Sequence, residues 1–128
     1  MDAQTLAARY RAYIDCLNRR DWDGLAAHVD PAVSRNGETL GLNGYRAMLE
    51  ADVRAIPDLS FEIALLVAEP PMVASRLAFD CRPQGLFLGL PVDGRRVRFY
   101  ENVFYAFRDG RIAEVWSVID RAAIEAQL

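Results

Sequence analysis

The fold is decided by one C-terminal stretch, Arg98-Phe-Tyr-Glu-Asn-Val-Phe-Tyr-Ala-Phe-Arg-Asp-Gly-Arg-Ile-Ala-Glu-Val-Trp-Ser-Val-Ile-Asp120. Two runs rich in aromatic and β-branched residues flank the dipeptide Asp109-Gly110. Asp-Gly between alternating apolar runs is typical of a tight hairpin turn. The stretch therefore predicts two antiparallel strands joined by a two-residue loop.

The predicted loop determines which side chains share a face, because side chains alternate along a strand. With Arg108 opposite Arg111, one face holds Phe99, Glu101, Val103, Tyr105, Phe107, Ile112, Glu114, Trp116, Val118 and Asp120. Glu101 and Asp120 become diagonal neighbours, with Cβ atoms about 7 Å apart. Two carboxylates on a largely apolar face are costly to bury, so this face is a candidate pocket wall.

The rest of the chain predicts helices first and strands afterwards. Helices are expected over residues 2–20 and 22–28, with a third that Asn43 caps and Pro57 ends. Strands are expected within residues 32–38, 59–67 and 73–81, followed by an irregular segment over 83–93 and a helical tail over 121–128. This order predicts one α+β domain over residues 1–128, with the helices packed on one face of a mostly antiparallel sheet.

The second face of the predicted hairpin is also apolar; it holds Tyr100, Phe104, Ala106, Val115 and Ile119. A sheet with one face in water alternates more cleanly between polar and apolar side chains. We therefore expect a partner subunit to cover this face, which predicts a homodimer formed through the sheet.

Composition argues against several classes of function. A net charge of −3 over 128 residues gives no basic footprint for nucleic acid. No apolar run approaches the ~20 residues of a membrane span, and no export signal is recognisable, so a cytoplasmic protein is expected. Cys16 and Cys81 are then expected to stay reduced, and with the single histidine His28 they make no persuasive metal site.

Three segments together carry a family resemblance: Pro57-Asp-Leu59, Gly85-Leu-Phe-Leu-Gly-Leu-Pro-Val-Asp-Gly94 and Asp109-Gly-Arg-Ile-Ala-Glu-Val-Trp-Ser-Val-Ile-Asp120. They resemble the SnoaL-like polyketide cyclases of the nuclear transport factor 2-like superfamily. The resemblance implies a cone-shaped α+β barrel, in which a curved sheet wraps around three N-terminal helices and encloses a deep pocket. It also implies frequent dimerisation through the sheet and no cofactor.

The resemblance implies a catalytic role for Asp120, which matches the aspartate that serves as acid and base in the cyclases. Pro83 stands where those enzymes have a pocket histidine, and residues 33–37 lack a second one. Glu101 is a catalytic candidate from the predicted register alone. The alternatives are that Asp120 caps the C-terminal helix and that Glu101 pairs with an arginine such as Arg35 or Arg46.

The residues expected to bind substrate are Tyr13, Tyr45, Met48, Phe79, Cys81, Phe99, Val103 and Trp116. Ligand pockets are mostly apolar with few polar groups, which suits a small apolar carbonyl or hydroxyl compound. The sequence thus predicts a cofactor-independent cyclase, isomerase or hydratase-type enzyme that uses carboxylate acid/base chemistry. The alternative is a non-catalytic small-molecule-binding or dimerisation module of the same fold.

Overall fold

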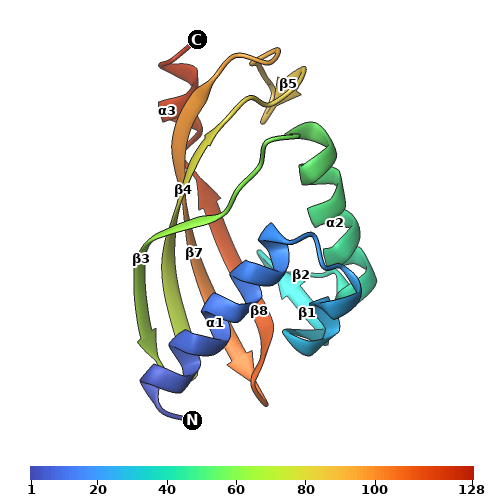
Figure 1. The fold of residues 1–128 in the computed structure, drawn as a ribbon, viewed down its shortest axis with the longest axis vertical. Coiled ribbons are helices and arrows are strands. Elements are labelled where there is room, and N and C mark those ends of the chain that lie inside the picture. The colour runs from blue at the N-terminus through green and yellow to red at the C-terminus, as the bar shows by residue number, and fades with distance from the viewer.

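A six-stranded sheet is the scaffold of the computed structural model, which describes all residues from 1 to 128 (Figure 1). Its strands are β1 (Val29–Arg35), β2 (Glu38–Thr39), β3 (Glu62–Glu69), β4 (Met72–Cys81), β7 (Val97–Arg108) and β8 (Arg111–Ile119). They are ordered β2-β1-β8-β7-β4-β3, and only β1 and β8 run parallel. The predicted α+β class with a mostly antiparallel sheet is confirmed, but the sheet stays open and does not close into a barrel.

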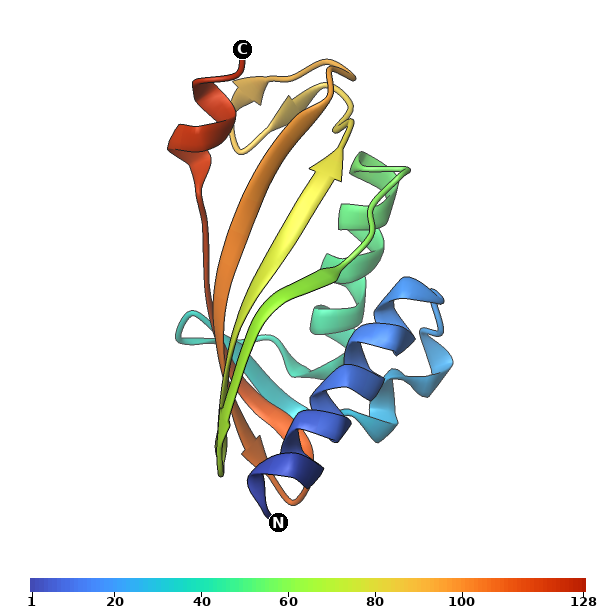
Figure 2. The ribbon, with the colours of Figure 1, turned by 60° about the vertical axis from the view of Figure 1, so that its left-hand side comes forward.

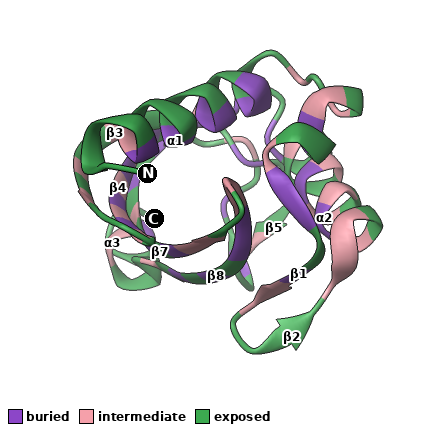
Figure 3. Ribbon diagram, turned by 90° about the horizontal axis from the view of Figure 1, so that it is seen from below, coloured by how far each residue is buried: buried purple, intermediate pink, exposed green.

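The helices are α1 (Ala3–Asn18), the short 3-10 helix η1 (Asp23–Ala27), α2 (Gly41–Ala55) and α3 (Arg121–Glu125). Asp2 caps α1, because its side chain accepts a hydrogen bond of 2.7 Å from the Thr5 amide. The buried stripe of α1 turns toward the sheet, as the colours of Figure 3 show. No helix combines the length and the apolar character that crossing a membrane requires.

The start of α2 differs from the prediction. The helix begins at Gly41, with Leu40 as its N-cap, and Asn43 lies inside the first turn. Leu40 and Leu42 both pack against the hydrophobic core. Burial of these two side chains outweighs the preference of asparagine for the capping position.

Helices α1 and α2 lie on the same side of the sheet, whereas the opposite side carries only α3 near one end (Figure 2). The side toward α1 and α2 is called the inner face below, and the opposite side the outer face. A single hydrophobic core of 26 buried residues lies mostly between the inner face and the helices. The outer face leaves large apolar side chains in contact with solvent.

The predicted register of the C-terminal hairpin is correct at the turn and wrong beyond it. Arg108 pairs with Arg111 and Phe107 with Ile112, as expected from Asp109-Gly110. Ala113 is then an extra residue, a β-bulge, because Ala106 pairs with Glu114. From there on every β8 side chain changes face. Val115, Ser117 and Ile119 point inward, while Glu114, Trp116 and Val118 point outward.

Candidate functional site

A cavity of about 210 Å³ lies between the inner face of the sheet and helices α1 and α2. Its lining comprises 21 residues, of which 17 are hydrophobic, so its few charged and polar groups stand out. These groups are Arg35, Asp52, Glu101 and Ser117. They come from β1, α2, β7 and β8, four elements that the fold brings together from distant parts of the chain.

The cavity brings together most of the residues predicted to bind substrate. Its wall includes Tyr13 of α1, Tyr45 and Met48 of α2, Phe79 of β4, and Phe99 and Val103 of β7. The expectation that these side chains share one enclosure is therefore met by the geometry, and their role in binding stays a prediction.

Two residues predicted to bind substrate lie elsewhere. Trp116 is 40% exposed on the outer face, because the bulge at Ala113 turns it away from the cavity. Cys81 is buried in the hydrophobic core, at the end of β4, and does not line the cavity. Both cysteines are free.

Asp120 lies outside the cavity, immediately before α3. Its Oδ1 accepts a hydrogen bond of 3.1 Å from the Ala123 amide, which is the arrangement of an N-cap. Its own amide donates to the Tyr100 carbonyl at 3.1 Å. The predicted pairing of Asp120 with Glu101 on one face is therefore wrong, since the bulge places the two residues on opposite faces of the sheet.

Glu101 points into the cavity from the middle of β7, as predicted. Ser117 on the neighbouring strand donates a hydrogen bond from its hydroxyl to Glu101 Oε2. Burial raises the pKa of Glu101 above its ordinary value, while this hydrogen bond and the positive charge of Arg35 act in the opposite direction. A carboxyl group with a raised pKa is well placed to accept and return protons near neutral pH.

Arg35 brings a positive charge to the same wall at the end of β1. Its Nη2 donates to Ser117 Oγ at 3.5 Å, and it takes part in no salt bridge. The Ser117 hydroxyl therefore bridges the Arg35 guanidinium and the Glu101 carboxylate, and the other donors of the guanidinium remain free. The direct ion pair between Glu101 and Arg35 or Arg46 is not formed; Arg46 pairs instead with Asp23 and Glu50.

Asn36 holds this part of the site in place. Its Oδ1 accepts from the Ser117 amide at 2.9 Å, and its Nδ2 donates to the Ser117 carbonyl at 3.3 Å. Asn36 has a φ of +49°, which asparagine tolerates better than most residues, and it begins the turn to β2. The turn thus fixes Arg35 and Ser117 relative to each other.

Asp52 lines the cavity from α2 and remains accessible to solvent. Burial of its inner side, followed by the negative charge of Glu101, raises the pKa of Asp52 to about 6. The positive charge of Arg35 opposes this shift. Sequence reasoning missed Asp52, although the spacing of Met48, Asp52 and Ile56 indicates one helix face.

Tyrosine hydroxyl groups supply neutral donors. The hydroxyls of Tyr13 and Tyr45 are 2.7 Å apart, and that of Tyr10 donates to Tyr105 at 3.5 Å. Burial raises the pKa of Tyr10 to about 12 and raises the pKa of the other three as well. All four therefore keep their protons near neutral pH.

Aromatic rings and a short hairpin form the opposite end of the cavity. Phe79 stacks on Phe99 with ring centroids 5.1 Å apart, and Phe61 packs edge-on against Phe79 at 5.6 Å. Residues predicted to be irregular form the hairpin of β5 (Leu86–Phe87) and β6 (Leu90–Pro91). This hairpin, called the flap below, places Phe87 and Leu88 in the cavity wall.

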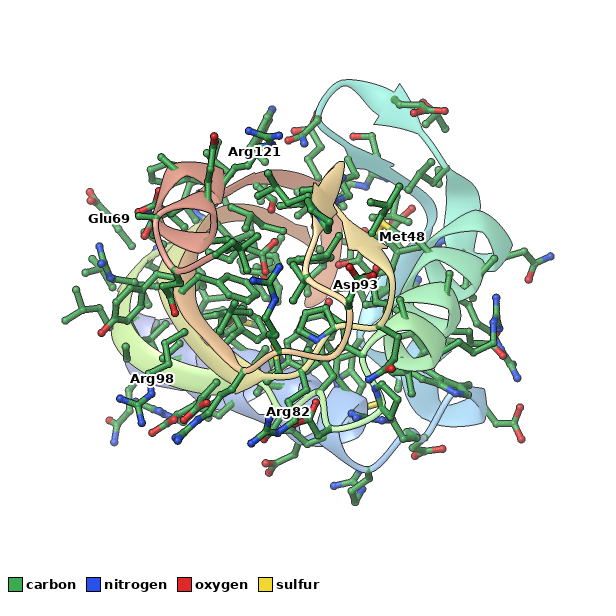
Figure 4. All side chains as sticks on the ribbon, turned by 90° about the horizontal axis from the view of Figure 1, so that it is seen from above. Met48, Glu69, Arg82, Asp93, Arg98 and Arg121 are labelled. Carbon is green, nitrogen blue, oxygen red and sulfur yellow. The ribbon has the colours of Figure 1, made fainter.

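The flap is attached to α3. The Nε of Arg121 donates a hydrogen bond of 2.9 Å to the Leu88 carbonyl. Figure 4 looks onto this end of the molecule, where Arg121 at α3, Asp93 after the flap and Met48 on α2 are labelled. Because Asp120 caps α3, its side chain supports the helix that carries this attachment.

No three His, Cys, Asp or Glu side chains come together in a cluster that could hold a metal ion. The cavity instead holds two carboxyls and one guanidinium, with serine and tyrosine hydroxyls around them. This set can move protons and stabilise an oxyanion.

The chain belongs to the SnoaL-like polyketide cyclase family, whose model matches residues 7–128. The resemblance inferred from the hairpin and the glycine-proline segment is thereby confirmed. Among curated proteins, none matches the chain significantly.

Solved structures show the same fold. A SnoaL-like polyketide cyclase from Agrobacterium tumefaciens strain C58 is 49% identical, with a TM-score of 0.95 over 99% of this chain and 98% of that one. TsrD from Streptomyces laurentii is 25% identical, with a TM-score of 0.85 over 99% and 96%. AclR from Streptomyces galilaeus, a proposed hydroxylase, is also 25% identical, with a TM-score of 0.79 over 98% and 96%.

Proposed function

We propose that the protein is a cofactor-independent enzyme that catalyses proton transfer on a small, largely apolar compound with an enolisable carbonyl group. The observation that carries this proposal is the Glu101 carboxyl, which lies in a largely apolar cavity with its pKa raised by burial. Such groups cluster at catalytic sites, where proton affinity is matched to the reaction.

The first step removes a proton from the carbon next to the carbonyl group. Glu101 accepts this proton, and the electron pair of the broken C–H bond moves onto the carbonyl oxygen as an enolate. The free donors of Arg35 and the tyrosine hydroxyls lie in the same cavity and stabilise that negative charge.

The second step decides the reaction. If protonated Glu101 returns the proton to a different atom of the enolate, the product is an isomer. If the enolate carbon attacks a second carbonyl of the same molecule, a ring closes and the new alkoxide takes the proton. Neither path consumes a cofactor, and the enzyme ends in its starting protonation state. The family of the chain supports the cyclisation path.

The proposal is tested by exchange of carbon-bound hydrogen in 2-tetralone, a compact bicyclic ketone, followed by proton NMR in D₂O. We expect the wild-type protein to accelerate exchange and Glu101→Gln to slow it by at least about 100-fold. The matched control is Glu114→Gln, the same chemical change on the outer face, which should exchange like wild type. Equal exchange rates in wild type and Glu101→Gln would contradict the proposal.

Titrating the protein with 2-tetralone and following protein chemical shifts by NMR measures binding, which tests the alternative function. A non-catalytic binding module would hold 2-tetralone or a related ketone in the cavity with equal affinity in wild type and Glu101→Gln, and would exchange its hydrogens in neither. Chemical-shift changes confined to cavity residues would then define the protein as a carrier or sensor of apolar carbonyl compounds.

A further inference from the structure

We propose that Asp52 is a second catalytic residue, which shares proton transfer with Glu101 and connects the cavity to solvent. The inference rests on the proposed function, because it assigns the acid and base roles of that same site to two groups. It follows from the position of Asp52 in the cavity wall, its access to water and the absence of any partner for its carboxylate.

Asp52 faces the cavity from the helical wall, whereas Glu101 and Arg35 face it from the sheet. A substrate between these walls would have one carboxyl on each side. One carboxyl can then remove a proton while the other supplies a second proton to a different atom. A single carboxyl would have to return the proton that it had just removed.

The Asp52 carboxylate makes no hydrogen bond or salt bridge within the protein. The side chain of Arg46, on the same helix, pairs with Asp23 and Glu50, and the Ser117 hydroxyl donates to Glu101. Its side chain therefore keeps its acceptor positions for water or for a ligand. A charged group on the cavity side of an amphipathic helix, without a structural partner, has no evident role in folding.

The groups that act on Asp52 are few. Burial has the largest effect on the pKa of Asp52; the charged groups across the cavity are Glu101 on β7, which also raises this pKa, and Arg35 on β1, which lowers it. When Glu101 is charged, it favours the protonated form of Asp52, and Arg35 limits that preference. The ionisation of the two carboxyls is thus linked, because the charge on one favours the protonated form of the other.

Exposure separates the two roles further. Asp52 reaches bulk water, so its proton can exchange with solvent, whereas Glu101 is half-buried and hydrogen-bonded to Ser117. Asp52 is therefore the group through which a solvent deuteron enters the site. Its removal should slow the entry of solvent hydrogen more than it weakens binding of the substrate.

The experiment measures two quantities in the full-length protein. The first is the titration of side-chain carboxyl carbons by NMR in wild type, Glu101→Gln and Asp52→Asn. We expect the Asp52 midpoint near 6 in wild type and at least about half a pH unit lower in Glu101→Gln, because a nearby negative charge is removed. The second is the pH dependence of 2-tetralone exchange. In Asp52→Asn, the change in exchange rate with pH near pH 6 should disappear, and the rate should fall at least about tenfold.

Asp15→Asn is the matched control, since Asp15 is an exposed helical aspartate on α1 that does not line the cavity. Asp52→Glu should restore most of the rate and its change with pH, which a merely structural role would not require. An Asp52 midpoint that stays the same in Glu101→Gln, or a wild-type pH profile in Asp52→Asn, would overturn the inference. If Glu101→Gln is inactive while Asp52→Asn matches wild type, the proposed function stands and only the role of Asp52 falls.

Discussion

Glu101 carries its carboxyl in a place where water cannot fully stabilise the charge. Its neighbours compensate in part: Ser117 donates to it, and Arg35 donates to Ser117. The remaining desolvation raises its pKa. A residue of this kind reduces the stability of the folded state and is retained in many enzymes because its proton affinity serves the reaction.

Replacing Glu101 with glutamine should therefore stabilise the protein near neutral pH. The folded pKa is raised, so the charged form is the unfavourable one. Its cost to stability is fully present above the folded pKa, declines as the pH falls through that pKa and is absent below the unfolded value. We expect Glu101→Gln to raise the free energy of unfolding by about 1 kcal/mol at pH 7 and to lose this advantage as the pH falls through the raised pKa to the ordinary value of 4.5.

Urea unfolding of wild type and Glu101→Gln at pH 7 and pH 4 measures this difference. Glu114→Gln is again the control, because its carboxyl is exposed on the outer face. A stability difference that is the same at both pH values would show that charge burial at Glu101 is not its cause.

At the scale of elements, α3 and the flap form a connected pair at the end of the cavity. Asp120 caps α3, the next residue Arg121 donates to the Leu88 carbonyl, and Leu88 lines the cavity. A residue outside the cavity can thus affect the site through the position of the flap. The resemblance implied a catalytic carboxylate at this position, and the structure shows a cap.

The two roles of Asp120 predict different outcomes for two substitutions. Asparagine caps helices about as well as aspartate, whereas alanine loses the cap at a cost of about 1 kcal/mol. We expect Asp120→Asn to resemble wild type, and Asp120→Ala to lose stability and to show faster amide hydrogen exchange in α3 and in the flap. Hydrogen exchange with mass spectrometry measures the latter.

2-Tetralone exchange completes this comparison. If Asp120→Asn loses activity while its α3 and flap remain protected, the carboxylate itself is needed and the role expected from the resemblance is correct. If only Asp120→Ala is affected, the contribution of Asp120 is that of a cap.

The hairpin shows how far the sequence determines the site. Asp109 and Gly110 adopt φ values of +52° and +78°, as a tight two-residue turn requires, and the strand before the turn follows the predicted alternation. The alternation predicted for this strand therefore placed Glu101 correctly, on the face that lines the cavity. The strand after the turn was misplaced, because a bulge at Ala113 has no local signature among residues that favour strands anyway.

Other parts of the site depend on contacts between distant segments. Arg35 reaches Ser117 across 82 positions of the chain, through a parallel pairing of β1 with β8 that no local pattern announces. Asp52 is different, since its place on the apolar stripe of a helix was visible in the sequence. The position of Glu101 across the cavity from Asp52 was not visible, because it depends on the sheet curving toward α2.

For the whole molecule, the outer face of the sheet is an exposed apolar surface that the site does not explain. Its exposed apolar side chains are Leu65, Val67, Tyr100, Phe104, Trp116 and Val118. Arg76 lies over the Tyr100 ring at 3.9 Å, which covers only part of this surface. A contiguous apolar surface of this kind usually marks an interface.

We propose that a second copy of the chain covers the outer face, as the family resemblance implies. Phe104 is 55% exposed near the middle of that face, and Phe104→Glu should weaken self-association at least about tenfold. Sedimentation equilibrium measures the effect. Leu86→Glu is the control, because Leu86 is an exposed apolar residue on the flap. A wild-type protein that stays monomeric at high micromolar concentration would contradict the proposal.

The bulge at Ala113 has a consequence for how such sites diverge. One extra residue in a strand reverses the alternation of every side chain that follows it, so that residues facing the cavity and residues facing solvent exchange places without any substitution. Deleting Ala113 would turn Trp116, Val118 and Asp120 toward the cavity and turn Val115, Ser117 and Ile119 outward. Glu101 would then lose its serine donor and gain an aspartate neighbour. A lineage could thus change its catalytic set by a single three-base deletion, with all the alternative residues already encoded.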